Sequence, residues 1–147
     1  MSKLPYVKTF RDLVVYQQAR QLAQEIFLLT RQFPKEEAFA LTDQIRRSSR
    51  SVGAQIAEAW AKRRYEKHFL SKLTDADGEQ QETQHWLETA LDGTYTTRET
   101  TDKLLADCQT IGRLLGSMMT KSTMFCNTPP NQLREQQATY FVDPAGN

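Results

Sequence analysis

The sequence predicts an all-α protein, an antiparallel up-down four-helix bundle. Three observations lead to this prediction. Apolar residues recur at alternating spacings of four and three over four segments, the segments are joined by short connections, and strand signals are nearly absent. A chain of 147 residues is long enough for one domain with a sizeable core. We expect the bundle over residues 1–126, with helices at about 10–33, 37–63, 66–92 and 97–125, and a flexible tail over 127–147.

The first helix is expected to begin after Thr9, which can cap it with Asp12 as a weak capping-box partner. Pro34 should end it, because proline cannot continue the hydrogen-bond ladder and restricts the residue before it. The core positions are Val15, Ala19, Leu22, Ile26, Leu29 and Phe33. A second apolar stripe consists of Tyr16, Ala23, Phe27 and Thr30. This apolar surface is wider than one bundle seam requires, which favours a subunit interface.

The second and third helices are expected to pack against each other. The second starts near Glu36 or Glu37, acids suited to the positive end of a helix dipole, and bends around residues 62–65. Its core positions are Leu41, Ile45, Ser48, Val52, Ile56 and Ala59. The third has Phe69, Leu73, Ala76, Gln80, Thr83, Leu87 and Ala90, and Gly93 ends it. Ser48, Gln80 and Thr83 are polar residues at core positions, so we expect them to satisfy one another or a buried water, because an unpaired group costs about 1–3 kcal/mol.

The fourth helix has a capping box formed by Thr96 and Glu99 at its start. Its core positions are Leu104, Cys108, Ile111, Leu115, Met118, Ser122 and Phe125. Gly112 and Gly116 lie one turn apart on this helix. They are either tolerated surface residues or a place where another helix approaches closely. In the tail, Tyr140 to Val142 would order only against a surface that a partner offers.

Positive charge is concentrated in the second helix and the connection that follows it. Residues 44–68 contain seven Lys or Arg and two acids, a net charge of +5, although the whole chain carries only +1. Residues 74–92 contain six acids and no Lys or Arg. The two segments run side by side in an antiparallel bundle, so some acids are expected to meet arginines of the second helix, within a subunit or across to a neighbour. The seven basic residues are Arg46, Arg47, Arg50, Lys62, Arg63, Arg64 and Lys67.

A phosphate-bearing partner is the functional interpretation of this charge, and a solvated basic turn is the plain one. Five of the seven residues are arginine, whose fork-shaped side chain matches phosphate oxygens. A continuous helix from Arg46 to Arg64 would extend roughly 27 Å, enough to follow several phosphates. Trp60, Tyr65 and Phe69 could stack on bases, although packing is the expected use of each. The main nucleic-acid contacts are expected to be Lys62, Arg63, Arg64 and Lys67, and the three helix arginines are expected to be partly structural.

Catalytic and metal-binding patterns are poor. Glu82 and His85 lie on one helical face, but di-iron bundles need two such pairs and two further glutamates. Ser48, Ser49 and Ser51 have no nearby histidine base, and no Gly-rich phosphate loop exists. We therefore expect a protein without enzyme activity, cofactor or metal. A metal-dependent bundle enzyme is kept as a remote alternative.

The sequence also indicates a cytoplasmic protein. Cys108 and Cys126 are the only cysteines, and their spacing matches no zinc or redox motif, which is typical of a reducing compartment. The longest apolar run near the start, Ile26 to Leu29, is far too short to span a bilayer. Residues 1–10 are mixed and polar, unlike a secretory signal.

Three motifs in order carry a resemblance to a known family. They are "FRDLVVYQQARQLAQEIF", then "FP" at Phe33–Pro34, then "QIRRSSRSVGAQIAEA". The chain resembles, from about Phe10 to Tyr95, the bacterial four-helix-bundle proteins first known from intervening sequences in large-subunit ribosomal RNA genes. The accessory variability protein of diversity-generating retroelements belongs to the same family. The matching positions are Gln44, Arg46, Arg47, Ser51, Ile56, Ala57, Glu58, Phe69 and Glu82.

The resemblance implies a small bundle that assembles as a homopentameric ring. In the retroelement branch, it further implies that the basic ring associates with a reverse transcriptase and its nucleic acid. The chain departs from the family pattern at Ala59-Trp60, where a glycine usually follows the Ala-Glu pair, and at Gln55, where asparagine is common. The segment "DADGEQQETQHWL" is also unusually acidic. These departures indicate a separate branch of the family.

Two main interpretations of function remain open at the level of the sequence. The first is a ring-forming adaptor that binds RNA, DNA or a nucleoprotein, such as a reverse transcriptase complex, through its basic surface. The second is a structural or protein-binding oligomer in which the basic face of one subunit docks on the acidic face of its neighbour. Salt-dependent binding of nucleic acid separates the two.

Overall fold

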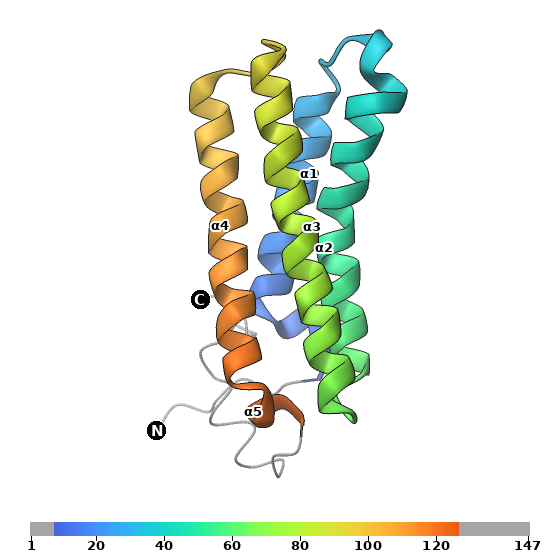
Figure 1. Ribbon diagram of the computed structural model, residues 1–147, viewed down its shortest axis with the longest axis vertical. Helices are drawn as coiled ribbons and strands as arrows, with labels where there is room; N and C mark the ends of the chain where they lie inside the picture. The colour runs from blue at the N-terminus through green and yellow to red at the C-terminus, as the bar shows by residue number, and fades with distance from the viewer. Residues whose placement is uncertain (1–7, 127–147) are drawn as a thin grey trace.

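The computed structural model describes residues 8–126, so the predicted tail and the segment Tyr140 to Val142 lie outside the described residues. Four long helices run up and down beside one another, and a short fifth helix follows them (Figure 1). The helices are α1 (Val14–Thr30), α2 (Asp43–Ala61), α3 (Glu66–Asp92), α4 (Arg98–Thr120) and α5 (Ser122–Cys126). Helix α2 packs between α1 and α3, and α4 closes the bundle by contacting α3 and α1. No β-strand occurs within residues 8–126, which confirms the all-α prediction.

The first predicted helix, 10–33, is divided near its start. Phe10–Asp12 form a 3-10 turn, and Leu13 is extended with φ −74° and ψ 128° before α1 begins at Val14. The capping box of Thr9 and Asp12 is present, but it caps this short turn and not the long helix. The break has a packing consequence, because the side chain of Leu13 is only 1% exposed and belongs to the core.

The connection between the first two long helices contains more turns than expected. Pro34 has an extended backbone, with φ −62° and ψ 146°, and precedes a 3-10 turn. In order, the chain has the end of α1 at Thr30, the 3-10 turn Lys35–Glu37, a π-helical turn Ala38–Thr42 and the start of α2 at Asp43. The first helix therefore ends before the proline, and the second begins after the predicted residue 37. The π turn buries Leu41 and leaves Phe39 89% exposed.

The third helix has the bounds that the sequence predicts, Glu66–Asp92, and Gly93 is its C-cap. Added side-chain bulk does not fit at Gly93, because a Cβ there would lie 2.8 Å from the Tyr95 ring. At the start of α4 the predicted capping box of Thr96 and Glu99 is wrong by one residue. Thr97 is the N-cap, and its side chain accepts a hydrogen bond from the backbone N–H of Thr100. The reason is the extended backbone of Thr97, with φ −93° and ψ 159°.

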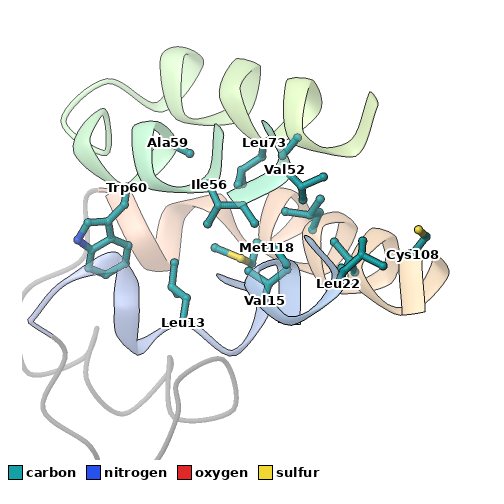
Figure 2. Close-up of a cluster of buried hydrophobic side chains, with 14 of the residues drawn as sticks. Leu13, Val15, Leu22, Val52, Ile56, Ala59, Trp60, Leu73, Cys108 and Met118 are labelled. Carbon is teal, nitrogen blue, oxygen red and sulfur yellow. The ribbon is translucent and has the colours of Figure 1, made fainter. Parts of the chain in front are cut away.

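Almost all predicted core positions are buried. In the four sets named from periodicity, Leu29 alone is only half-buried. Figure 2 shows core side chains from all four long helices, among them Leu22, Val52, Leu73 and Cys108, in one cluster. A smaller cluster of Phe33, Leu41 and Ala90 fills one end of the bundle. The apolar periodicity of the sequence thus identified the core correctly.

The predicted buried polar layer is present between α2 and α3. The hydroxyl oxygens of Ser48 and Thr83 are 2.8 Å apart, and both residues are fully buried. Gln80 is also buried, but it bonds within its own helix: its amide donates to Asp77 at 2.9 Å and accepts from Gln84 at 2.7 Å. Gly112 of α4 makes room for it, because a Cβ there would lie 2.8 Å from the Gln80 amide nitrogen. Gly112 therefore serves packing inside the subunit.

Candidate nucleic-acid interface

The turn between α2 and α3 carries four of the seven predicted contacts. We call Lys62, Arg63, Arg64 and Lys67 the turn cluster. Helix α2 ends at Ala61, and the N–H of Lys62 still donates to the carbonyls of Glu58 and Ala59. The backbone then turns through residues 62–65 before α3 begins, as the sequence predicted. The helix is therefore not continuous from Arg46 to Arg64, as a length of 27 Å would require. The turn cluster lies instead in the connection at one end of the bundle.

Three cations of the turn cluster are exposed. Lys62, Arg64 and Lys67 have no carboxylate within ion-pairing distance among residues 8–126. The acid in the same stretch, Glu66, is half-buried and accepts a hydrogen bond from the hydroxyl of Ser122 at 3.1 Å. Lys72 and, to a smaller extent, Lys62 lower the pKa of the Glu58 carboxyl, but Lys62 makes no ion pair with it. Most of the positive charge of the turn is thus left for solvent or for a partner.

Arg63, the fourth residue of the turn cluster, packs against Trp60 at the end of α2. Its guanidinium lies over the Trp60 ring at 3.5 Å from the centroid, and its Nε donates to the Trp60 carbonyl at 2.8 Å. Burial lowers the pKa of Arg63 from its ordinary value, yet an arginine keeps its charge at physiological pH. The stacked guanidinium also covers Trp60, which is 7% exposed.

Two of the three helix arginines lie on an aromatic ring of α1. Arg46 and Arg50 have their guanidinium carbons 4.8 Å and 5.4 Å from the centroid of the Phe27 ring. Arg46 also donates to the Thr30 hydroxyl at 2.8 Å. Arg46 and Arg50 form no ion pair with acids of α3 within residues 8–126, because Phe27 of the second apolar stripe holds them on the α1 side of α2 instead. Pairing with acids of a neighbouring subunit stays a prediction.

The remaining helix arginine, Arg47, does pair with α3. It contacts Glu82 and, at 3.3 Å, Glu79. The indole N–H of Trp86 donates to Glu82 at 2.9 Å, and this bond together with Arg47 lowers the pKa of the Glu82 carboxyl. The hydrogen bond from Arg47 to Glu82 in turn raises the pKa of Arg47. The charge of Arg47 is therefore compensated by two acids within the subunit, as the sequence predicted for part of this segment.

The aromatic residues of the same stretch separate into two groups. Trp60 is covered by Arg63, and Phe69 is fully buried, with its ring stacked on Phe125 at a centroid distance of 5.8 Å. Tyr65 is 58% exposed, and its ring lies 5.5 Å from that of His68, which is exposed as well. His68 lies one helical turn after Tyr65 at the start of α3, which brings the two rings together.

Glu82 and His85, the two candidate metal ligands on one face of α3, have other neighbours in the structure. Glu82 is engaged by Arg47 and Trp86, and the His85 ring packs edge-on against Trp86 at 4.7 Å. Within residues 8–126 no group of three or more His, Cys, Asp or Glu side chains is arranged to hold a metal ion. Both cysteines are free thiols, Cys108 buried and Cys126 half-buried. None of the helices in this part of the chain is long and apolar enough to cross a membrane.

The second apolar stripe of α1 lines a groove between α1 and α2. The groove has a volume of about 390 Å³ and contains the half-buried Tyr16, Ala23 and Phe27 together with Gly53 and Arg50. Gly53 is buried, and a Cβ there would make ordinary contact with the Tyr16 ring at 3.6 Å. The wide stripe is thus partly used inside the subunit, by Tyr16 against α2 and by Phe27 under the two arginines.

Comparisons with known proteins agree with this architecture. The family model of the 23S rRNA-intervening sequence protein matches residues 11–117. Among solved structures, a protein of unknown function from the S23 ribosomal protein family of Bacteroides thetaiotaomicron is 32% identical, with a TM-score of 0.66. That similarity covers 73% of this chain and 96% of the other chain. A search of curated proteins gives no match. Since the family model matches most of the chain and the solved structure shares its helical arrangement, the chain belongs to the family of 23S rRNA-intervening sequence proteins.

Proposed function

We propose that this protein is a non-enzymatic, ring-forming helical bundle that binds nucleic acid or a nucleoprotein through the turn cluster. The observation that carries the proposal is the set of exposed cations Lys62, Arg64 and Lys67, which have no carboxylate partner among the described residues. Arg63 supports them from the Trp60 ring. Arg46, Arg47 and Arg50 contribute less, because Phe27, Glu79 and Glu82 already engage them.

The physical basis of binding is the release of counterions from the phosphate backbone. Each phosphate that a Lys or Arg neutralises releases condensed cations, so the affinity falls steeply with salt. Contacts to phosphates carry no sequence information, and no groove-reading motif accompanies them, so binding should be weakly selective for sequence. A ring would repeat the turn cluster around one rim and multiply the number of phosphates that are contacted together.

Binding is tested by a salt series of nucleic-acid affinity. The test variant carries Lys62→Ala, Arg64→Ala and Lys67→Ala, and it leaves Arg63 in place because that residue packs on Trp60. The control variant, Arg31→Ala with Lys35→Ala and Arg98→Ala, loses the same charge from the α1–α2 connection and the start of α4. Both lie at the end of the bundle opposite the α2–α3 turn (Figure 1).

We expect the turn variant to bind more weakly than the wild type, and the slope of log affinity against log salt to fall by about 2–3 per subunit. The control should keep most of the wild-type slope. Equal slopes for the wild type and the turn variant would exclude the turn cluster as a phosphate site.

The oligomeric part of the proposal is a closed ring, most simply of five subunits, held by contacts between different faces of neighbouring subunits. The wide apolar stripe of α1 and the charge polarity of the chain support it, and the family resemblance suggests the number. Light scattering at micromolar concentration measures the mass directly. A monomer in that experiment would contradict the ring.

The nucleoprotein partner that we propose for this protein is a reverse transcriptase of a diversity-generating retroelement with its nucleic acid. The family resemblance supports this choice, and the basic turn is chemically suited to it. Co-purification of the protein with a reverse transcriptase encoded beside its gene would support the accessory role, and the absence of such a gene would argue against it.

The second candidate function is a structural oligomer whose basic and acidic faces dock between subunits. It is favoured by Glu88 and Asp92, exposed acids of α3 that have no ion-pair partner within residues 8–126. In that case the turn variant would change the mass in light scattering and leave nucleic-acid binding unaffected.

A further inference from the structure

We propose that the α2–α3 turn binds unpaired nucleotides, with one base stacked on Tyr65 while Lys62, Arg64 and Lys67 hold the phosphates beside it. This inference rests on the proposed function, since it assumes that the turn cluster binds phosphates. It goes further because it names the form of nucleic acid that the turn selects: a single strand, and not a duplex.

The first argument is the exposure of Tyr65. Of the three aromatic residues in this stretch, Trp60 and Phe69 are committed to the interior, at 7% and 0% exposure, whereas Tyr65 is 58% exposed. Its backbone is extended, with φ −123° and ψ 106°, at the N-cap of α3, although its side chain makes no capping hydrogen bond. Tyr65 therefore has no role in the core and no capping role that would account for a large aromatic side chain at this place.

The second argument is the setting of the ring. In the sequence Tyr65 directly follows Arg64 and stands two residues before Lys67, so cations flank it along the chain of the turn. The His68 ring lies at 5.5 Å with an angle of 50° between the two planes, so it abuts the tyrosine without covering it. An exposed aromatic ring in the same turn as cations that have no carboxylate partner among residues 8–126 is a combination suited to single-stranded nucleic acid.

The third argument is what a duplex would offer to the same surface. In a duplex the base faces are stacked on one another, so only phosphates and groove edges are accessible. A duplex would therefore contact the cations through its phosphates, but none of its bases would stack on Tyr65. A single strand exposes its base faces, and aromatic stacking is tolerant of sequence because every base has a π-face. The ratio of single-strand to duplex affinity thus isolates the role of the ring.

The test compares a labelled pyrimidine strand with a duplex of the same length, in RNA and DNA forms, by fluorescence anisotropy. The variants are Tyr65→Ala, Tyr65→Phe, which keeps the ring, and the triple substitution at Lys62, Arg64 and Lys67. A strand with one 2-aminopurine base adds a direct readout, because its fluorescence is quenched when the base stacks. Circular dichroism confirms that each variant is folded, which is expected since Tyr65 is exposed.

We expect Tyr65→Ala to weaken single-strand binding about tenfold, to abolish the quenching and to leave duplex binding unchanged. Tyr65→Phe should behave like the wild type, and the triple variant should weaken both ligands. Equal effects of Tyr65→Ala on both ligands, or no effect on either, would overturn the stacking inference. The proposed function would still stand in that case if the triple variant bound both ligands more weakly than the wild type. If the triple variant bound both ligands like the wild type, the proposed function itself would fail.

Discussion

Thr94 is the only non-glycine residue within the described part of the chain that has a positive φ, 60°. It follows the C-cap of α3 in a Schellman turn, in which the N–H of Tyr95 donates to the carbonyl of Ala90 and the N–H of Thr94 donates to that of Leu91. A β-branched residue is unfavourable in this left-handed conformation, where glycine has no Cβ to clash. The turn therefore carries local strain at Thr94.

We expect Thr94→Gly to raise the free energy of unfolding by about 0.5–1 kcal/mol, because it relieves this strain. The matched substitution at the preceding residue, Gly93→Ala, should do the opposite, since its Cβ would lie 2.8 Å from the Tyr95 ring. Urea denaturation of both variants measures the two effects. A Thr94→Gly protein that is less stable than the wild type would show that the threonine side chain stabilises the turn.

At the scale of single side chains, the surroundings also decide which cations are available. Arg47 and Arg64 are both exposed arginines, but the first pairs with Glu79 and Glu82 of α3 and the second has no carboxylate partner in the described structure. The availability of an arginine for phosphate thus depends on which helix faces it.

At the scale of elements, the contact between α2 and α3 contains a hydroxyl pair inside an apolar seam. The carbonyl of Glu79 lies 2.9 Å from the Thr83 hydroxyl, and either hydroxyl can donate the hydrogen of the 2.8 Å bond between Ser48 and Thr83. Ser48 also has the carbonyl of Ile45 at 3.3 Å, to which it can turn if Thr83 is lost. Each hydroxyl therefore keeps a backbone partner when the other is removed.

We expect Ser48→Ala and Thr83→Val each to lower the free energy of unfolding by about 1 kcal/mol, because each removes the bond between the helices without leaving a buried group unpaired. The double variant should cost clearly less than the sum, because the same bond cannot be lost twice. Urea denaturation of the four proteins in a double-mutant cycle measures the coupling. Additive effects would mean that the hydroxyl pair does not connect α2 and α3 energetically.

At the scale of the whole molecule, buried and paired titratable groups set how stability depends on pH. Burial raises the pKa of Cys108 to about 12 and that of the half-buried Cys126 to about 11. The folded protein therefore keeps thiol protons that the unfolded chain releases, so this contribution is present below the unfolded thiol pKa and is lost as the pH rises. The Glu82 carboxyl has a lowered pKa, so its contribution is present above the unfolded value and is lost as the pH falls.

We expect the free energy of unfolding to be greatest near neutral pH, to decline below about pH 4.5 and to decline above about pH 8.5, where unfolded thiols ionise. The Cys108→Ala variant should be less stable at neutral pH because it leaves a cavity, but its alkaline decline should be shallower. Urea denaturation at a series of pH values gives both profiles. Identical alkaline slopes in the wild type and the variant would show that Cys108 does not control this decline.

The sequence by itself determined the number of long helices, their core positions and the place of the α2–α3 turn. These features are readable because each depends on residues three and four apart on one helix, so a buried face appears as a local periodicity. The bounds of α3, Glu66–Asp92, follow for the same reason. The concentration of positive charge in residues 44–68 is likewise a property of the sequence alone.

The tertiary structure decided which of those charged and aromatic residues are available to a partner. Arg46 lies on Phe27 of α1 and Arg47 on acids of α3, contacts between residues far apart in the chain that no local pattern contains. Packing also leaves Tyr65 exposed while Trp60 and Phe69 are buried, and it places Leu13 in the core at a break in the first helix. The physical reason is the same for all of these residues. The exposure and ion pairing of a side chain depend on which side chains of other helices lie opposite it, and the packing of the helices against one another determines those neighbours.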